Sequence, residues 1–219
     1  MPAGSPSGSV RRPLFARLWS RVAGPALDRA GIGEHRARLL AGLSGEVVEI
    51  GPGNGLNFPH YPSTVTRVLA VEPEEQLRAL ATEAARTAPV PVEVAAGTAD
   101  AIPADDASFD AVVVCLVLCS VPDQAAALAE ARRVLKPGGQ LRFFEHVRAD
   151  SPAMRQVQRA VDATFWPLLC GGCHTGRDTR SAIDAAGFRL TDVRTFTFPD
   201  TRIPSPAGTH ILGTAQRAD

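Results

Sequence analysis

The chain has 219 residues, of which 45% are hydrophobic and 21% are charged, which is enough to bury one full core. Basic and acidic residues balance at 23 each, so the composition argues against an electrostatic grip on nucleic acid or anionic lipid. We therefore expect a single domain over residues 13–219 and no nucleic-acid partner. Composition alone predicts no oligomeric state.

The first 44 residues divide into a tail and a helical region. Residues 1–12 are small, polar and proline-containing, which predicts a disordered tail. Apolar side chains alternate with arginines at helical spacing in residues 14–22, and a second helix is predicted over residues 34–43. We expect residues 13–44 to form a helical cap over a ligand cleft, with binding to a membrane surface as the alternative role of the first helix. No apolar stretch reaches the length of a secretion signal or a membrane span, so we expect a cytoplasmic protein without an integral membrane segment.

A glycine-rich loop follows the first predicted strand, residues 46–50. This strand consists mainly of valine and isoleucine, as expected for a strand covered on both faces, and it carries Glu49 near its end. Glycines then occupy alternate positions: Gly51, Gly53 and Gly55. Without side chains, they let the backbone approach a nucleotide-like ligand. The dinucleotide fingerprint needs its third glycine where this chain has Leu56, so the spacing argues against nicotinamide or flavin.

The second predicted strand, residues 68–72, ends in another carboxylate, that of Glu72. This residue follows the glycine loop by about 20 positions, the distance that one βαβ step requires. A carboxylate at this point can accept hydrogen bonds from both vicinal hydroxyls of a ribose. We therefore predict an adenosine site with Glu72 as its ribose ligand.

The rest of the chain alternates predicted strands and helices. A helix over residues 74–87 is followed by a strand at 90–95, an acidic loop, a strand at 109–118 and a helix at 123–135 that proline and glycine chemistry at 136–139 ends. Further strands are predicted at 140–147, 188–193 and 209–215, with a helix at 178–186. The alternation predicts an α/β fold with a doubly wound, mostly parallel seven-stranded sheet and helices on both faces. Ligands of such sheets bind beyond the carboxyl ends of the strands.

Several of these motifs resemble those of the class I S-adenosylmethionine-dependent methyltransferases. The pattern from Glu49 to Gly55 resembles their motif I, and residues 108–113 and 134–139 resemble their later motifs, so the similarity covers residues 46–147. The resemblance implies a Rossmann-like fold with an antiparallel C-terminal edge strand and S-adenosyl-L-methionine as cofactor. It also implies the cofactor-binding residues: Glu49, Gly51, Gly53, Asn54, Gly55, Glu72, Pro73, Thr98, Ala99, Asp100 and Cys115.

A narrower resemblance concerns the acceptor side. Residues 116–121, 143–147, 165–169 and 172–177 are similar to the methyltransferase-like seven group, whose members methylate small thiols. The resemblance implies direct in-line methyl transfer to a small-molecule acceptor, with a thiol as first choice. Two alternatives stay open: a lipid, quinone or other oxygen, nitrogen or carbon nucleophile as acceptor, and a non-catalytic domain that only binds the cofactor.

His146 is the predicted catalytic residue, because an imidazole beside the methyl group could accept the thiol proton or stabilise the thiolate. A histidine that only holds the strand end is the alternative. We expect the insertion over residues 150–176 to form an acceptor-side lid, since it is aromatic and apolar where a plain connection would be polar. The predicted substrate contacts are Cys119, Glu145, Phe165, Trp166 and His174.

Cys170, Cys173 and His174 match the C-x-x-C-H pattern of c-type haem attachment. Haem attachment would require export, and no export signal is recognisable. A zinc site would need further ligands, yet the pattern places Cys115 and Cys119 at the end of a buried strand. The sequence therefore predicts no metal, and free thiols in a tight glycine turn.

Overall fold

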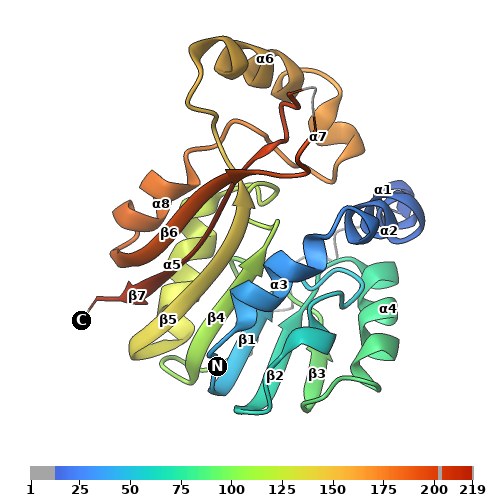
Figure 1. Ribbon diagram of the computed structural model, residues 1–219. Helices are drawn as coiled ribbons and strands as arrows, with labels where there is room; N and C mark the ends of the chain where they lie inside the picture. Colours follow the sequence, from blue (N-terminus) through green and yellow to red (C-terminus); the bar gives the residue numbers. More distant parts are fainter. Residues whose placement is uncertain (1–12, 202–203, 219) are drawn as a thin grey trace, which may run out of the picture.

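The computed structural model describes residues 13–201 and 204–218, so the predicted tail over residues 1–12 lies outside the described residues. A seven-stranded sheet in the order β3-β2-β1-β4-β5-β7-β6 forms its centre (Figure 1). The strands are β1 (Gly45–Ile50), β2 (Val65–Val71), β3 (Val92–Ala95), β4 (Phe109–Cys115), β5 (Leu135–His146), β6 (Phe188–Thr197) and β7 (Thr209–Arg217). The helices are α1 (Pro13–Leu18), η1 (Trp19–Ala23), α2 (Gly24–Arg29), α3 (Ile32–Leu40), η2 (Phe58–His60), α4 (Glu75–Ala85), α5 (Gln124–Val134), α6 (Pro152–Asp162), α7 (Trp166–Leu169) and α8 (Thr179–Ala185).

The doubly wound, mostly parallel fold is confirmed. Strands β1 to β5 pair in parallel, and β7 is antiparallel to both of its neighbours. The antiparallel strand lies one place inside the edge, because β7 inserts between β5 and β6 and leaves β6 as the outermost strand. This hairpin completes the sheet on the side of β5.

Helices cover both faces of the sheet, and two apolar clusters fill the space beneath them. Side chains of α5 and α8 pack on one face, together with Val48 of β1 and Val112 of β4. Side chains of α3, η2 and α4 pack on the other face, together with Val47 and Val113. Successive residues of a strand point to opposite faces, so a central strand covered on both sides needs an unbroken apolar run. The valine-rich sequences of β1 and β4 satisfy this need.

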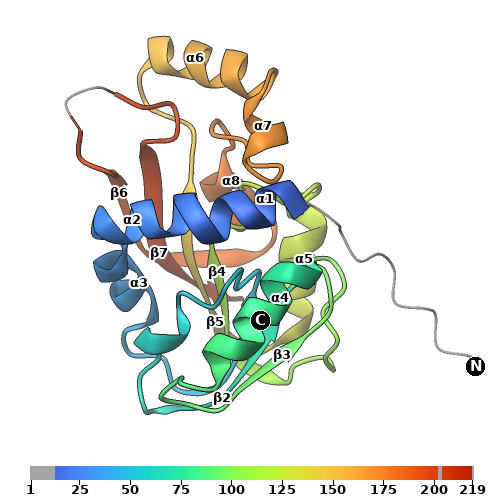
Figure 2. The same cartoon turned by 90° about the vertical axis from the view of Figure 1, so that its right-hand side faces the viewer.

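The first N-terminal helix is longer than the predicted 14–22, since helical residues run from Pro13 to Arg29. Helices α1, η1 and α2 follow one another as one rod, which Figure 2 shows crossing in front of the sheet. Its middle section, η1, is a π-helix, a form that is rare and usually confined to single turns. No helix among residues 13–201 and 204–218 combines the length and apolarity needed to cross a lipid bilayer.

Strand β4 ends earlier than predicted, and this changes the site. It stops at Cys115 rather than at residue 118, because Leu116 adopts a left-handed backbone conformation with φ of 60°. The Leu116 N–H still donates to the Phe144 carbonyl at 2.7 Å, and the chain then turns away from the sheet. A left-handed leucine costs roughly 1–2 kcal/mol, so the surrounding contacts must hold this turn in place.

The insertion between β5 and α8 carries α6 and α7 beyond the carboxyl end of the sheet, at the top of Figure 1. One fully buried side chain, Gln158 of α6, ties it down. The Gln158 amide donates to the carbonyls of Val147, Thr175 and Pro206 and accepts from the N–H of Ala149, at distances between 2.9 and 3.1 Å. The insertion is therefore anchored to the end of β5 and to the loop before β7.

Candidate active site

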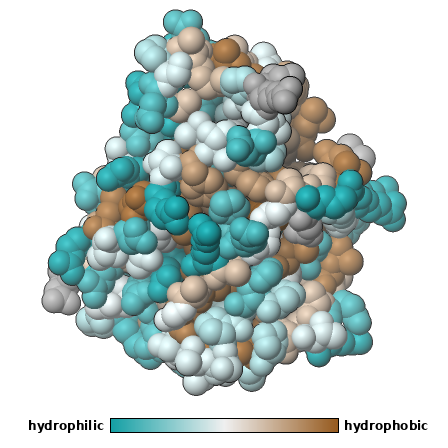
Figure 3. All heavy atoms as spheres, in the orientation of Figure 1, coloured by the Kyte–Doolittle hydropathy of each residue, from teal (hydrophilic) through white to brown (hydrophobic). Residues whose placement is uncertain are grey.

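A cavity of about 600 Å³ lies beyond the carboxyl ends of β1, β2, β4 and β5. Its walls come from the sheet loops, from the α1–α2 rod and from α7 and the turn that follows it. Figure 3 shows apolar surface at the upper right, where α7 and α1 lie in Figure 1. Exposed apolar side chains of this region are Leu18 of α1, Val22 of η1, and Leu168 and Leu169 of α7. The cavity thus has an apolar rim, and two different polar regions lie inside it.

The glycine loop forms the floor of the first region. Gly51 and Gly53 both have positive φ values, 64° and 60°. A Cβ on Gly51 would lie 2.7 Å from a methyl carbon of Val117, and one on Gly53 would lie 3.4 Å from Nε1 of Trp19. Any side chain here would fill space that the cavity now keeps open, so the backbone itself forms this wall.

Glu72 stands beside this loop with its carboxylate fixed by the backbone. Its oxygens accept the N–H groups of Gly53 at 2.9 Å and of Glu74 at 3.0 Å. The side chain is 5% exposed, and burial raises the pKa of Glu72 to about 7 despite both hydrogen bonds. Each carboxylate oxygen can accept a further hydrogen bond, so the group can receive two hydroxyls from a ligand in the cavity.

Glu49 is held by a buried polar cluster. It accepts from the Asn57 amide and from the Tyr61 hydroxyl, each at 2.7 Å. Arg36 of α3 donates to the Asn57 oxygen at 2.8 Å and lies 3.3 Å from the sulfur of Cys115. Burial raises the pKa of Glu49, while its hydrogen bonds with Tyr61 and Asn57 act in the opposite direction.

Two polar atoms at this end of the cavity have no partner: Nε of Arg36 and Oδ1 of Asn54. Both atoms are buried, and a buried polar atom without a partner costs about 1–3 kcal/mol. One is a cationic donor and the other an acceptor, so together they could receive a ligand that carries both a carboxylate and an ammonium group.

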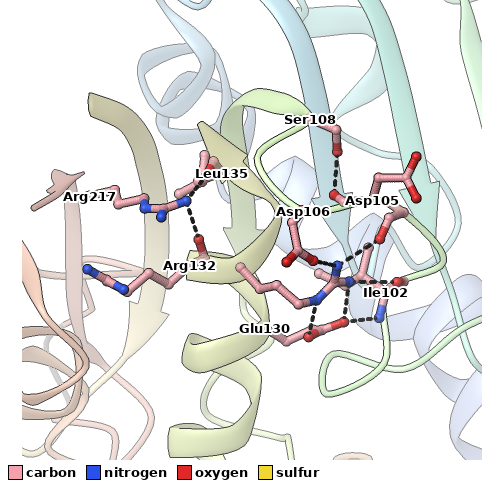
Figure 4. A network of polar contacts seen from close by, with 10 residues as sticks. Ile102, Asp105, Asp106, Ser108, Glu130, Arg132, Leu135 and Arg217 are labelled. Carbon is pink, nitrogen blue, oxygen red and sulfur yellow. Dashed lines mark hydrogen bonds and ion pairs between the residues drawn. The ribbon is translucent and has the colours of Figure 1, made fainter. Parts of the chain in front are cut away.

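The loop after β3 closes the far side of this region with Thr98, Ala99 and Asp100. A polar network fixes the loop to α5 (Figure 4). The Glu130 carboxylate accepts the N–H of Ile102 at 2.9 Å, and Arg133 donates both to that carboxylate and to the Ile102 carbonyl. The hydrogen bond from Arg133 lowers the pKa of Glu130. The ion pair of Arg133 with Glu130 on α5 thus fixes the position of this loop.

Arg217 of β7 forms the other part of Figure 4. Its guanidinium donates to the carbonyls of Arg132 and Leu135, where α5 passes into β5. Arg132 lies in the last turn of α5, where carbonyls have no partner within the helix, and Leu135 is the first residue of β5. The contact attaches the C-terminal hairpin to α5, the helix whose Glu130 and Arg133 also hold the loop after β3.

The second polar region contains two thiols and an imidazole. Cys119 comes from the turn after β4, His146 from the end of β5 and Cys173 from the turn after α7. The sulfur of Cys173 lies 3.4 Å from Nδ1 of His146, and the three ligand atoms lie within 4.8 Å of one another. The neighbouring Cys119 thiol and then His146 lower the pKa of Cys173, while the pKa of Cys119 is raised. All three residues line the cavity.

The fully buried carboxylate of Glu145 holds the Cys119 turn in place. It accepts the N–H groups of Val117 at 2.9 Å and of Cys119 at 3.1 Å, and burial raises its pKa to about 7. The N–H of His174 donates to the Cys119 carbonyl at 2.8 Å, which joins this turn to the one that carries Cys173. The expectation that Cys119 stands at the end of a buried strand is therefore wrong, because β4 ends at Cys115 and the chain leaves the sheet at Leu116.

Most of the predicted site residues meet in the one cavity. Its walls include Glu49, Gly51, Gly53, Asn54, Glu72, Pro73, Thr98, Ala99, Asp100, Cys115, Cys119, His146 and Trp166. Four others lie outside these walls: Gly55, Glu145, Phe165 and His174. A Cβ on Gly55 would lie 2.8 Å from the Cβ of Ala84 and 2.8 Å from the Phe58 ring. This glycine therefore allows α4 and η2 to pack closely against the loop. Phe165 is 54% exposed, and Nδ1 of His174 lies 2.8 Å from the Gly172 carbonyl.

Sequence patterns missed several residues of the cavity wall. Arg36, Asn57 and Trp19 lie on predicted helices or loops without a motif, and His210 is one polar position in β7, a strand of the C-terminal hairpin. The His210 ring lies 4.5 Å from that of His146, and burial lowers its pKa to about 3. Only Cys173 had a usable signal, because it stood beside a predicted site residue in the C-x-x-C-H segment.

Comparison with known proteins identifies the family. A model of the methyltransferase domain matches residues 48–143. Thiol S-methyltransferase TMT1B of Rattus norvegicus is 35% identical over 181 residues, which are 80% of this chain and 73% of that protein. The chain belongs to the thiol S-methyltransferase family. It is a methyltransferase that uses S-adenosylmethionine, as its sequence motifs predict.

Two further similarities place this family member among other methyltransferases. The ubiquinone/menaquinone biosynthesis C-methyltransferase UbiE of Enterobacter sp. (strain 638) is 29% identical over 156 residues, which are 70% of this chain and 57% of that protein. A crystal structure of an S-adenosylmethionine-dependent methyltransferase of Thermotoga maritima, described as a possible histamine N-methyltransferase, superposes with a TM-score of 0.68. It is 23% identical and covers 93% of this chain and 98% of its own, so this likeness concerns the fold.

The cavity of this thiol S-methyltransferase family member fits S-adenosylmethionine. Backbone without side chains at Gly51 and Gly53 leaves room for the cofactor, and the Glu72 carboxylate has free acceptor capacity for ribose hydroxyls. The unpartnered atoms of Arg36 and Asn54 fit the carboxylate and ammonium groups of a methionine moiety.

Proposed function

We propose that the protein transfers the methyl group of S-adenosylmethionine to a small thiol. The observation that carries the proposal is the 35% identity to thiol S-methyltransferase TMT1B over 80% of the chain. The cavity supports it, since a single space joins the glycine loop to the cluster of Cys119, His146 and Cys173. Bound S-adenosylmethionine supplies a methyl group on a positively charged sulfur, which a thiolate can attack directly.

Residues at the glycine-loop end of the cavity would bind S-adenosylmethionine. Glu72 and Pro73 hold the ribose, and the loop from Thr98 to Asp100 encloses the adenine. Glu49 acts indirectly, since its two oxygens are already engaged by Asn57 and Tyr61 and it keeps the Arg36 guanidinium at the cavity wall. These residues position the donor, which is the main task in a direct displacement.

His146 is the residue that we propose acts on the acceptor thiol. Its ring lines the cavity at the end opposite to Glu72, where it can take the proton of a bound thiol or hold the thiolate. A thiol with an ordinary pKa near 8.5 is already partly ionised at neutral pH, so the proton transfer demands little. Trp166 and Cys119 line the same end and would contact the acceptor.

Residues 13–44 and 150–176 form the proposed enclosure of the reaction. Phe15, Trp19 and Leu27 of the N-terminal rod, together with Trp166 and Leu169 of the insertion, face the cavity. Apolar walls exclude water from the thiolate and favour apolar acceptors. Their arrangement supports a cap over the donor and a lid over the acceptor. The four free cysteines suit a reducing compartment, so we place the protein in the cytoplasm.

A quinol or other oxygen, nitrogen or carbon nucleophile is the second candidate acceptor, which the similarity to UbiE favours. Incubation of the purified protein with labelled S-adenosylmethionine and panels of thiols, phenols, amines and quinols separates the candidates. We expect S-adenosylhomocysteine release and methyl thioether formation with apolar thiols. Turnover confined to quinols or amines would refute the thiol proposal, and cofactor binding without turnover on any panel would leave only a binding role.

A further inference from the structure

The cluster of Cys119, His146 and Cys173 has the composition and spacing of a metal site. Within the described residues it is the one group of three histidine, cysteine or acidic side chains whose ligand atoms come together in this way. Two thiols and an imidazole are the ligands that Zn²⁺ prefers.

We propose that Cys119, His146 and Cys173 bind a thiophilic divalent cation, with Zn²⁺ as the natural occupant, and that the acceptor thiol takes the remaining coordination position. The inference deepens the proposed function, because its second half rests on a thiol acceptor. The cation site itself rests on geometry alone.

The distances suit a tetrahedral ion. Zinc–sulfur bonds of about 2.3 Å and zinc–nitrogen bonds of about 2.0–2.1 Å place tetrahedral ligand atoms roughly 3.5–3.8 Å apart. The sulfur of Cys173 and Nδ1 of His146 are 3.4 Å apart, and every pair in the cluster lies within 4.8 Å. Binding would therefore move the ligand atoms relative to one another by about 1 Å or less, which side-chain rotation can supply.

Each ligand is held on a separate and well-anchored segment. The Cys119 backbone is fixed by the Glu145 carboxylate and by the N–H of His174. The N–H of Cys173 donates to the Cys170 carbonyl at 3.1 Å, which closes the second turn. His146 ends β5, where its ring packs against His210. Ligands pre-positioned in this way lose little freedom when an ion binds.

Three protein ligands leave one position of a tetrahedral ion open. Catalytic zinc sites have this composition, whereas structural zinc sites have four protein ligands. All three side chains line the cavity, so the open position faces the space that also reaches the glycine loop. A molecule bound to the ion would therefore share the cavity with the methyl donor.

Methyl transfer to a cation-bound thiol needs no reactant besides the thiol and S-adenosylmethionine. The acceptor thiol loses its proton to solvent when its sulfur binds the cation, since a coordinated thiol is deprotonated. A lone pair of that sulfur forms the new bond to the methyl carbon as the bond between this carbon and the sulfonium sulfur breaks. The products are the methyl thioether, which is a weak ligand and leaves, and neutral S-adenosylhomocysteine. His146 then acts on the acceptor through the cation.

The metal proposal revises an expectation from sequence. The absence of a metal was predicted because the sequence has no second C-x-x-C pair and because Cys115 and Cys119 were placed at the end of a buried strand. The left-handed turn at Leu116 brings Cys119 to the cavity instead. His174, the histidine of that segment, does not join the cluster, and His146 takes the place.

The test begins with binding of Zn²⁺ alone. Full-length protein freed of metal with a chelator is titrated with Zn²⁺ against a chromophoric competitor, and we expect one equivalent to bind. Cys119→Ser, His146→Ala and Cys173→Ser should each weaken binding by at least tenfold, or about 1.4 kcal/mol. Cys170→Ser is the matched control, because it removes a neighbouring thiol outside the cluster and should keep the equivalent.

Circular dichroism and cofactor binding show whether each variant is folded. Cobalt provides a second readout that does not depend on the variants. Protein loaded with Co²⁺ should show thiolate-to-cobalt absorption, and this absorption should change on addition of an acceptor thiol but not of its methyl thioether. Absence of a Zn²⁺ equivalent in the wild-type protein, or equal binding by the Cys173→Ser and Cys170→Ser variants, would overturn the metal site.

Activity separates this inference from the proposed function. We expect chelator-treated enzyme to lose at least tenfold in thiol methylation and to recover it with Zn²⁺. Full activity of protein shown to be metal-free would overturn the role of the cation and leave thiol methylation intact. Zn²⁺ binding by an enzyme that methylates no thiol would instead refute the proposed acceptor while the cation site stands.

Discussion

We expect the buried carboxylate of Glu72 to make the affinity for S-adenosylmethionine depend on pH. Its pKa of about 7, raised by burial from the ordinary 4.5, means that the group is largely protonated in the cofactor-free protein at pH 6. A protonated acid has lost acceptor capacity for two ribose hydroxyls. If only the carboxylate binds, affinity for S-adenosylmethionine should fall by up to about tenfold for each pH unit below 7.

The same shift predicts how stability changes with pH. A folded-state pKa above the unfolded value means that the folded protein binds the proton more tightly, so this stabilisation is complete below pH 4.5 and is lost as the pH rises through about 7. The shift from 4.5 to about 7 corresponds to roughly 3 kcal/mol. In Glu72→Gln the group cannot titrate. The difference in free energy of unfolding between this variant and the wild type should therefore change by up to about 3 kcal/mol between pH 4.5 and 8.

Calorimetric titration with S-adenosylhomocysteine between pH 5.5 and 8.5 measures the effect on affinity, and urea denaturation between pH 4.5 and 8.5 measures the effect on stability. Glu72→Gln should bind about 1–3 kcal/mol more weakly at pH 8 and show little further pH dependence. Glu83→Gln removes an exposed carboxylate of the helix α4 and should behave like the wild type. Wild-type affinity that is constant over this range would refute the assignment of Glu72 to the ribose.

Three further substitutions test how the site is built. Gly55→Ala should lower the free energy of unfolding by about 2–4 kcal/mol in urea denaturation, because φ is 81° and the new Cβ would lie 2.8 Å from Ala84. Gly42→Ala is the control: its φ is 73° and its Cβ would meet no atom within 4 Å, so it should cost only about 1–2 kcal/mol. Equal losses in the two variants would contradict the packing role of Gly55. Gln158→Leu leaves buried polar groups unpaired and should cost about 2–4 kcal/mol and raise the KM for the acceptor, whereas Gln156→Leu on the exposed side of α6 should change neither. Arg133→Gln should raise the Kd for S-adenosylmethionine about three- to tenfold by loosening the loop after β3, and an unchanged Kd would show that the loop needs no such support.

The sequence alone was sufficient for the framework and for placing the glycine loop and Glu72 at one end of the cavity. Valine-rich runs predicted β1, β2 and β4 because a strand buried on both faces must be apolar throughout. The alternate glycines and Glu72 were recognisable because each follows directly from a strand, and parallel strands end at the same edge of the sheet. Motif and spacing are local properties, so a linear pattern contains them.

The acceptor end was decided by tertiary structure. Nothing in residues 116–121 predicts a left-handed Leu116, which persists because buried Glu145 accepts the N–H groups beyond it. Likewise, Arg36 reaches the cavity only through the packing of α3 on the sheet, and His210 only through the pairing of β7 with β5. The meeting of Cys119 with Cys173 depends on hydrogen bonds between turns that are far apart in the chain. Periodicity reports which face of an element is buried, but it does not report which distant side chain shares that space.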